Sequence, residues 1–334
     1  MKDSEIQAII DRVTREVGGT IPVTRETAVS RRHQQTAPEP PPAGGDNGVF
    51  PTLDEAVAAA GTAFRQLNKM PLEIRKHMVA HMRQAGREYA QVLAEMAQSE
   101  SGMGRVEDKT LKNILNADKT LGVEALEPDA WSGDGGLTIT EWAPYGVIGA
   151  LTPSTNPTST VICNAIAMVA AGNAVTFNVH PSTENASNYT VQILNQAIQK
   201  AGGPANLLTA VAHPTIESAT NLMHHKDIRL LTVTGGAAVV RAAMRSGKRA
   251  VCAGPGNPPV VVDETADLEQ AGRDIVIGGS FDNNIVCTTE KETLAVDGID
   301  DELMQVKTQH GAGKRNSGQV NQLWQAVTAN ERGE

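Results

Sequence analysis

Short apolar stretches alternate with amphipathic ones through the middle of the chain, and this alternation limits the folds open to it. The stretches typical of strands are 146–151, 174–179, 207–211, 228–234 and 259–262. The stretches typical of helices lie between them, at 159–171, 184–201, 215–224 and 237–245. Continuous apolar strands such as Leu230-Leu231-Thr232-Val233 suit a sheet that is buried on both faces. The pattern predicts an α/β fold, with helices on both faces of a parallel sheet.

The composition narrows the class of protein further. A chain of 334 residues with 40% hydrophobic and 20% charged residues is typical of a globular protein, and its length allows two domains. A net charge of −9 and 3% aromatic residues argue against a nucleic-acid partner. Because the sequence has neither a membrane-spanning apolar run nor a signal-peptide core, we expect a cytoplasmic protein without a membrane partner.

The cysteines and histidines do not predict a metal site. Cys163, Cys252 and Cys287 are too widely spaced for a disulfide framework or a metal cluster. The histidines show no spacing typical of metal ligands either. We therefore predict that the protein binds no metal and works in a reducing compartment.

Residues 1–19 predict a short amphipathic helix. Its apolar positions recur at helical spacing and are Ile6, Ile9, Ile10, Val13 and Val17. Residues 20–48 contain a run of prolines and a pair of glycines, which is typical of a linker. We expect the helix to be tethered to the globular part. The alternative is that it packs on its own domain or on a sister subunit.

The globular part begins at Val49 with helices and a hairpin. Thr52 is expected to cap a helix that ends near Leu67, and further helices are expected at 71–98, 105–119 and 319–329. The stretch 137–151 predicts a hairpin in which residues 137–142 turn at Pro144-Tyr145-Gly146 and pair with the residues that follow.

Cys287 is the first candidate for a catalytic residue. It lies between a helical stretch and an apolar run, 292–296, where a thiol could face a cleft. A free cysteine is only a few per cent thiolate at pH 7, so a nucleophilic role requires a nearby cation or a positive helix end. The alternative is a small buried hydrophobic residue.

Two loops with prolines could complete such a site. Asn156, in the loop 151–157, has an amide that could donate to a developing oxyanion, although the loop could also be a plain connection. Gly254 and Gly256 belong to the loop 251–259, whose prolines are expected to make it rigid.

A phosphate-binding turn is predicted at Thr234-Gly235-Gly236. The chain has no G-x-G-x-x-G fingerprint, but this turn joins a strand to a helix that begins near Ala237. Free backbone amides at the start of a helix attract a pyrophosphate. Glycine turns after strands are common, so the motif alone is weak.

Several motifs together resemble the CoA-acylating aldehyde dehydrogenases, from about Gly48 to the end of the chain. The motifs are 152–157, 253–259, 262–267 and 280–287, with a further signature at 100–109. The sequence is most similar to the ethanolamine-utilisation acetaldehyde dehydrogenases. The propanediol-utilisation propionaldehyde dehydrogenases come next.

The resemblance implies both a fold and a reaction. The expected fold is aldehyde dehydrogenase-like, with a dinucleotide-binding domain over residues 49–256 and an incomplete α/β catalytic domain over residues 257–334. A short-chain aldehyde, with acetaldehyde favoured over propionaldehyde, would react with NAD and CoA to give acyl-CoA and NADH. Cys287 would carry the thioester, and Asn156 and the Cys287 backbone amide would hold the oxyanion. Ala253 stands where hydrolytic relatives carry a glutamate base, which agrees with CoA as acyl acceptor.

The resemblance also implies a set of binding residues. Those expected to bind NAD or CoA are Thr152, Pro153, His180, Pro181, Thr234, Gly235, Gly236, Gly254 and Gly256. Glu184 and Asn185 replace two lysines of the family pattern. This loss of positive charge is expected to weaken the attraction for a phosphate.

Three further expectations concern assembly. In the family that the sequence resembles, the region of the hairpin is an oligomerisation flap, so we expect a homo-oligomer. The helix over residues 1–19 resembles an encapsulation peptide that docks on a shell protein, which would place the protein in the lumen of a bacterial microcompartment. Because family members continue past the residue that matches Glu334, the alternative is a catalytically inactive, truncated relative that is targeted to the shell.

Overall fold

The computed structural model describes residues 47–327, apart from the side chain of Val327. All of them belong to one of the two units into which the chain divides, residues 40–334. The helix predicted over residues 1–19 and the linker predicted over 20–48 lie outside the described residues, apart from Asn47 and Gly48. None of the helices within 47–327 combines the length and the apolar character that crossing a membrane requires.

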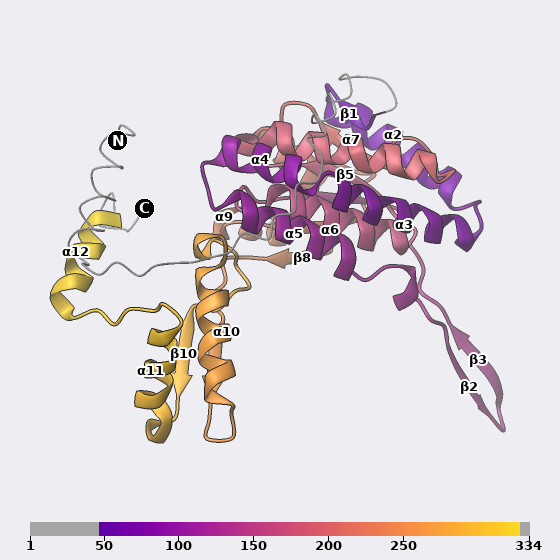
Figure 1. The fold of residues 1–334 in the computed structure, drawn as a ribbon. Helices are drawn as coiled ribbons and strands as arrows, with labels where there is room; N and C mark the ends of the chain where they lie inside the picture. The colour runs from indigo at the N-terminus through magenta and orange to yellow at the C-terminus, as the bar shows by residue number, and fades with distance from the viewer. Residues whose placement is uncertain (1–46, 328–334) are drawn as a thin grey trace. The chain divides into compact units, whose positions relative to one another are not determined.

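A six-stranded parallel sheet lies at the centre of the described residues (Figure 1). In spatial order its strands are β1 (Val49–Phe50), β6 (Leu208–Val211), β5 (Ala174–Asn178), β4 (Val147–Leu151), β7 (Leu230–Thr234) and β8 (Ala250–Ala253). Every position of β4, β5 and β6 is buried, because helices cover both faces of the sheet. The predicted α/β fold with a parallel sheet is confirmed.

Helices cover this sheet in layers. The helices are α2 (Leu53–Leu67), α3 (Leu72–Glu88), α4 (Ala90–Ser101), α5 (Val106–Lys119), α6 (Pro157–Ala170), α7 (Glu184–Lys200), α8 (Ile216–His224) and α9 (Ala237–Arg245). Since crossovers between parallel strands are right-handed, α6 and α7 lie on one face, and α8 and α9 on the other. The helices α3, α4 and α5 pack over α6 and α7.

The predicted helix boundaries are mostly close to the observed ones. Thr52 caps α2 and forms a capping box with Glu55, as its position before an apolar helical stretch indicated. The helix predicted over 71–98 is instead two helices, because the backbone of Tyr89 leaves the helical conformation between α3 and α4.

The strand predicted at 259–262 forms, but in another sheet than expected. This strand, β9 (Pro259–Val262), pairs in parallel with β10 (Glu292–Ala295). The edge of the central sheet is formed by β8, residues that the sequence had suggested were a loop. Pro255 and Pro258 have no N–H to donate to a neighbouring strand. The chain therefore leaves the central sheet after β8 and enters the two-stranded sheet only at β9.

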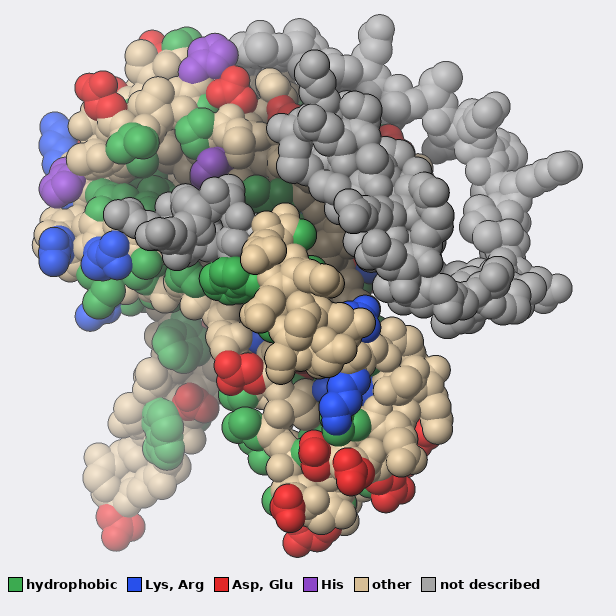
Figure 2. Space-filling view, turned by 90° about the vertical axis from the view of Figure 1, so that its left-hand side faces the viewer, with side chains coloured by type: hydrophobic (Ala, Val, Ile, Leu, Met, Phe, Trp, Pro, Cys, Tyr) green, Lys and Arg blue, Asp and Glu red, His purple; other side chains and the backbone are tan. Residues whose placement is uncertain are grey.

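The hairpin also lies earlier in the chain than predicted. Strand β2 (Asp129–Gly133) pairs with β3 (Gly136–Thr140), whereas residues 147–151 form the central strand β4. The turn is Asp134-Gly135, a dipeptide that two-residue hairpin loops favour. The hairpin extends away from the sheet in Figure 1, and hydrophobic side chains lie exposed along it in Figure 2.

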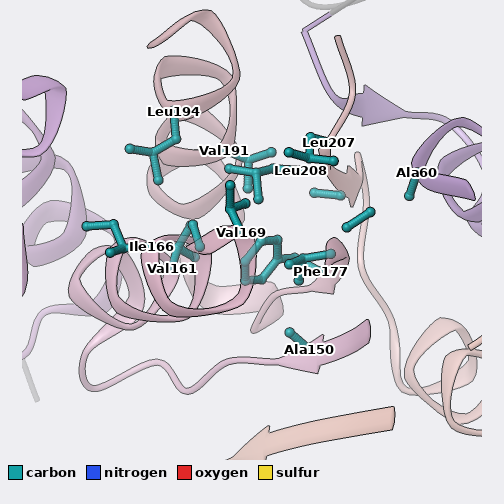
Figure 3. Close-up of a cluster of buried hydrophobic side chains, with 14 of the residues drawn as sticks. Ala60, Ala150, Val161, Ile166, Val169, Phe177, Val191, Leu194, Leu207 and Leu208 are labelled. Atoms are coloured by element: carbon teal, nitrogen blue, oxygen red, sulfur yellow. The ribbon is translucent and has the colours of Figure 1, made fainter. Parts of the chain in front are cut away.

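The main hydrophobic core joins the sheet to the helices on both of its faces, and Figure 3 shows the part of it around α6 and α7. Phe177 of β5 is fully buried, as are Ile166 of α6 and Leu194 of α7. A core of this kind fixes the sheet, and therefore the positions of the loops that leave its strands.

A second, smaller cluster forms after β8. Its buried members are Val262, Ile275 and Leu303, which come from β9, α10 (Leu268–Ser280) and α11 (Asp300–Gln309). The described chain ends with α12 (Ser317–Val327). The predicted domain boundary between residues 256 and 257 stays a prediction.

Candidate functional site

A cavity of about 600 Å³ lies at the carboxyl ends of the central strands. The chain runs from β4 outward to β5 and β6 and then returns to β7 on the other side of β4. Such a reversal leaves a crevice at the strand ends, where ligands of open α/β sheets bind. The walls come from the segments after β4, β5, β7 and β8 and from residues 285–287.

Every predicted site residue except Asn156 lines this cavity. These residues are Thr152, Pro153, His180, Pro181, Thr234, Gly235, Gly236, Gly254, Gly256 and Cys287. The fold thus brings the candidate nucleophile to the same cavity as the candidate phosphate-binding turn. Their chemical roles stay predictions.

Cys287 lies half-buried in the turn that precedes β10. The loop after β8 packs directly on it, since a Cβ atom added to Gly256 would lie 2.2 Å from the carbonyl oxygen of Cys287. A larger residue at position 256 would therefore push the turn or the loop out of place. This contact explains why the loop carries glycine here.

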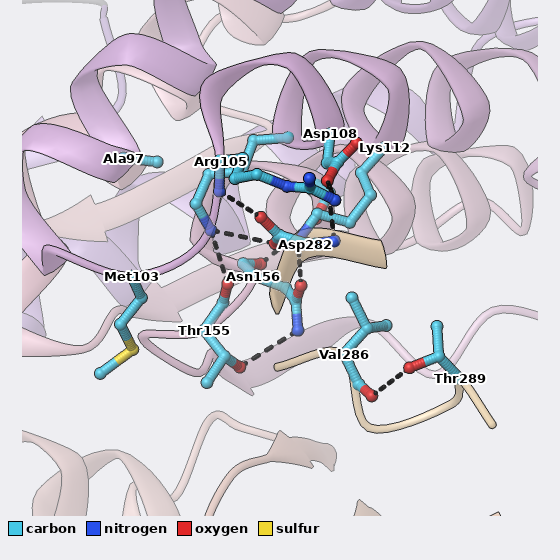
Figure 4. Close-up of polar contacts among 12 residues, drawn as sticks. Ala97, Met103, Arg105, Asp108, Lys112, Thr155, Asn156, Asp282, Val286 and Thr289 are labelled. Atoms are coloured by element: carbon cyan, nitrogen blue, oxygen red, sulfur yellow. Dashed lines mark hydrogen bonds and ion pairs between the residues drawn. The ribbon is translucent and has the colours of Figure 1, made fainter. Parts of the chain in front are cut away.

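Asp282 anchors the segment before Cys287 to helix α5 (Figure 4). Its fully buried carboxylate accepts hydrogen bonds from the Lys112 ammonium, from the Lys109 ammonium at 3.3 Å and from the Arg105 N–H at 2.7 Å. The N–H of Asp282 donates to the Asp108 carboxylate at 2.9 Å. The signature at 100–109, singled out from the sequence, contains Arg105, Asp108 and Lys109, but no pattern predicted that these residues meet Asp282.

Lys112 also holds Asn156. Its ammonium donates to Oδ1 of Asn156 at 2.5 Å, and Nδ2 of Asn156 donates to the Thr155 hydroxyl at 3.1 Å. Burial lowers the pKa of Lys112 from its usual value, while the hydrogen bond to Asp282 opposes this effect. Asn156 does not line the cavity, although its neighbour Thr155 does. Its role as an oxyanion donor stays a prediction.

No role was predicted for Lys291, although it lines the cavity together with Cys287. Its side chain is half-buried and binds backbone carbonyl groups of the turn that carries Cys287. A lysine soon after a candidate nucleophile was the one signal in the sequence. Lysines are so common on surfaces that this signal was too weak to use.

The wall formed by α9 fits the pyrophosphate of a dinucleotide such as NAD. Gly236 is the N-cap residue of α9 and provides no side-chain cap, so the first amides of the helix are open to a ligand. A Cβ atom added to Gly236 would meet nothing within 4 Å. The buried hydroxyl of Thr152 has no hydrogen-bond partner within residues 47–327 and so fits a polar ligand group.

Helix α7 begins shortly after His180 and Pro181, which line the cavity, and a carboxylate binds the first amides of this helix. The Glu100 carboxylate accepts from the backbone N–H groups of Asn185 (3.2 Å) and Ala186 (3.0 Å) and from the Asn185 side chain (2.6 Å). Glu184 lies 3.4 Å from the ring of His213. The amides at this helix start are thus already paired with an anion. The expected loss of phosphate affinity stays a prediction.

Known proteins match most of the described residues. The family described as "Aldehyde dehydrogenase family" matches residues 49–316. The acetaldehyde dehydrogenase (acetylating) EutE of Escherichia coli K12 is 50% identical over 302 residues, which cover 90% of this chain and 64% of that protein.

Two solved structures are similar to the chain as well. The propionaldehyde dehydrogenase of Rhodopseudomonas palustris, with bound CoA and an acylated cysteine, is 44% identical with a TM-score of 0.81. The propionaldehyde dehydrogenase of the Clostridium phytofermentans fucose utilisation bacterial microcompartment is 46% identical with a TM-score of 0.81. Each match covers 85% of this chain and 66% of the solved chain. The chain thus spans slightly less than two thirds of the length of these relatives.

Proposed function

Because the chain belongs to the aldehyde dehydrogenase family, we propose that it is the nucleophile-bearing part of a CoA-acylating, NAD-dependent aldehyde dehydrogenase. Its reaction converts a short-chain aldehyde, NAD and CoA into acyl-CoA and NADH. The observation that carries this proposal is the position of Cys287 on the wall of the cavity that also contains Thr234-Gly235-Gly236. Acetaldehyde is the favoured substrate, because the acetaldehyde dehydrogenase is 50% identical and the propionaldehyde dehydrogenases are 44% and 46% identical.

We propose the following roles for the groups that form the site. The Cys287 thiolate attacks the aldehyde carbon, so that a C–S bond forms and the π electrons of the carbonyl move to its oxygen. The Cys287 N–H stabilises that oxygen. For the Asn156 amide to do so as well, its Nδ2 must turn from the Thr155 hydroxyl toward the cavity. The open start of α9 and the Thr152 hydroxyl would hold NAD, which when bound would supply the acceptor for the hydride that leaves as the C–H bond of the former aldehyde carbon breaks. Cys287 then carries a thioester, from which the CoA thiol displaces the cysteine.

The family resemblance supports CoA rather than water as the acyl acceptor. It implies that Ala253, at the end of β8, stands where hydrolytic relatives carry a general base. A methyl side chain cannot activate water, so a thiol with its own nucleophilicity is the better acceptor.

The first test is NADH formation by the 334-residue chain with acetaldehyde, NAD and CoA. Because Cys287 forms the covalent intermediate, Cys287→Ala should lower the rate about a thousandfold or more. Cys163→Ala, at another half-buried free cysteine, should leave it unchanged. Turnover that survives in Cys287→Ala would disprove the mechanism.

If the unchanged chain is inactive, the alternative of an inactive, shell-targeted relative is favoured. The same assay with propionaldehyde compares the two substrates by kcat/KM.

The assembly proposals rest on the relatives and on the hairpin. We propose that residues 1–19 dock on a shell protein and place the protein in a microcompartment lumen, since one similar structure comes from a microcompartment enzyme. We also propose that the hairpin β2–β3 contacts another copy in a homo-oligomer. Its exposed apolar side chains, Trp131, Leu137 and Ile139, support this contact.

A further inference from the structure

The segment that carries Cys287 is folded around the ammonium group of Lys291. Nζ of Lys291 donates hydrogen bonds to the carbonyl oxygens of Asn284 at 2.7 Å and Val286 at 2.9 Å. It also donates to the Thr289 hydroxyl at 3.3 Å and to the side-chain oxygen of Asn284. One cation therefore binds acceptors on both sides of Cys287.

The backbone of Lys291 is fixed as well. Its N–H donates to the carbonyl oxygen of Pro258 at 3.0 Å, at the start of the β9–β10 pair. The side chain thus projects from a rigid sheet edge into the turn. The fixed backbone limits the positions that the ammonium group can reach.

The carbonyl group of Val286 belongs to the same peptide group as the N–H of Cys287. Across residues 47–327, no acceptor is hydrogen-bonded to that N–H. A hydrogen bond from a cation draws electron density out of a peptide group and strengthens its N–H as a donor. The hydrogen bond from Lys291 to the Val286 carbonyl group therefore makes the N–H of Cys287 a stronger donor.

We propose that Lys291 is a positioning residue that strengthens the Cys287 N–H as an oxyanion donor. When the thiolate adds to a carbonyl carbon, a C–S bond forms and the π electron pair moves to the oxygen. The Cys287 N–H receives that negative charge, and Lys291 stabilises it through the peptide group between them. The inference deepens the proposed function and rests on it for the identity of the nucleophile.

Two reagents separate this role from a purely structural one. With p-nitrophenyl acetate, a C–S bond forms, the C–O bond breaks, and the electron pair leaves with p-nitrophenolate after an oxyanion has formed. With iodoacetamide, the thiolate displaces iodide and no oxyanion arises. Peptide mass spectrometry over time gives the rate of each reaction at Cys287. Neither reagent needs NAD or CoA.

Lys291→Met is expected to slow acylation of Cys287 about tenfold and to change its alkylation less than about twofold. The expected loss is smaller than the roughly hundredfold loss on removing an oxyanion donor, because the N–H itself remains. Lys291→Arg keeps the cation and should recover part of the acylation rate. Lys248→Met is the matched control, since Lys248 is also half-buried and donates to a backbone carbonyl, that of Ile228, at 3.0 Å.

Three results would overturn the inference. Equal losses with both reagents would mean that Lys291 only shapes the turn. Unchanged acylation in Lys291→Met would mean that it has no effect on the oxyanion. Acylation of Cys287 no faster than that of Cys163 in the unchanged chain would mean that this turn holds no oxyanion. Absence of CoA-dependent NADH formation would instead count against the proposed function and leave these rates interpretable.

Discussion

At the scale of single residues, Asp282 holds the segment before Cys287 against helix α5. It is fully buried and pairs with Lys109 and Lys112, two lysines of one helix. Its φ of +49°, and the positive φ of Asn283 and Asn284, turn the chain back before the nucleophile. Left-handed backbone at non-glycine residues costs about 1–3 kcal/mol each, so surrounding contacts must hold it. The ion pairs of Asp282 are such contacts.

Replacing Asp282 with Asn should therefore destabilise the protein. The change removes the ion-pair partner of two buried ammonium groups, which costs about 3–5 kcal/mol in comparable cases. Urea denaturation, monitored by circular dichroism, measures the loss of unfolding free energy. Asp274→Asn is the control, because Asp274 forms an exposed pair with Arg273 and should change stability by less than about 1 kcal/mol. Similar values for the two variants would contradict the prediction.

At the scale of elements, the two-stranded sheet β9–β10 is covered on one face only. Val262 and Ala295 lie in the second core, against α10 and α11. Val261 and Leu294 pair across the sheet on the other face and are 74% and 55% exposed. Since apolar side chains of this size are costly to hydrate, this face favours association with another apolar surface.

The double variant Val261→Thr with Leu294→Thr should reduce self-association of the 334-residue chain. Threonine keeps the preference for strands while it lowers the apolar surface, so the sheet should persist. Sedimentation velocity over a range of protein concentrations measures the effect. Leu115→Gln removes another exposed leucine, on α5, and should change association less. If the double variant associates as strongly as the unchanged chain, the face is not responsible.

At the scale of the whole molecule, the proposed shell docking depends on residues 1–19 rather than on the globular part. A fluorescent fusion of the chain should co-localise with shell proteins in cells that make microcompartments. Ile9→Glu with Ile10→Glu should disperse it, because the charges interrupt the apolar stripe. Arg12→Gln, which leaves the predicted apolar stripe intact, should not. Unchanged localisation of the Ile9→Glu, Ile10→Glu variant would refute the targeting proposal.

Local signals in the sequence predicted where helices begin when a capping residue or a glycine turn marks the start. The N-cap at Thr52 and the helix Ala237–Arg245 were predicted with their observed starts. The hairpin was misplaced because its alternating strand, 136–140, fits a partner on either side, and only the Asp134-Gly135 turn distinguishes them. The strand at 259–262 was assigned to the wrong sheet because a strand's pattern does not identify its neighbour.

The sequence by itself determined the α/β class, the family resemblance and ten of the residues that line the cavity. It did so because parallel strands bring their ends to one edge, so that motifs after successive strands must meet there. Only the tertiary structure decided how Asp282 joins the lysines of α5, and how Lys291 binds the peptide group before Cys287. Such contacts depend on the packing of distant or sharply turned segments, and no local spacing encodes them.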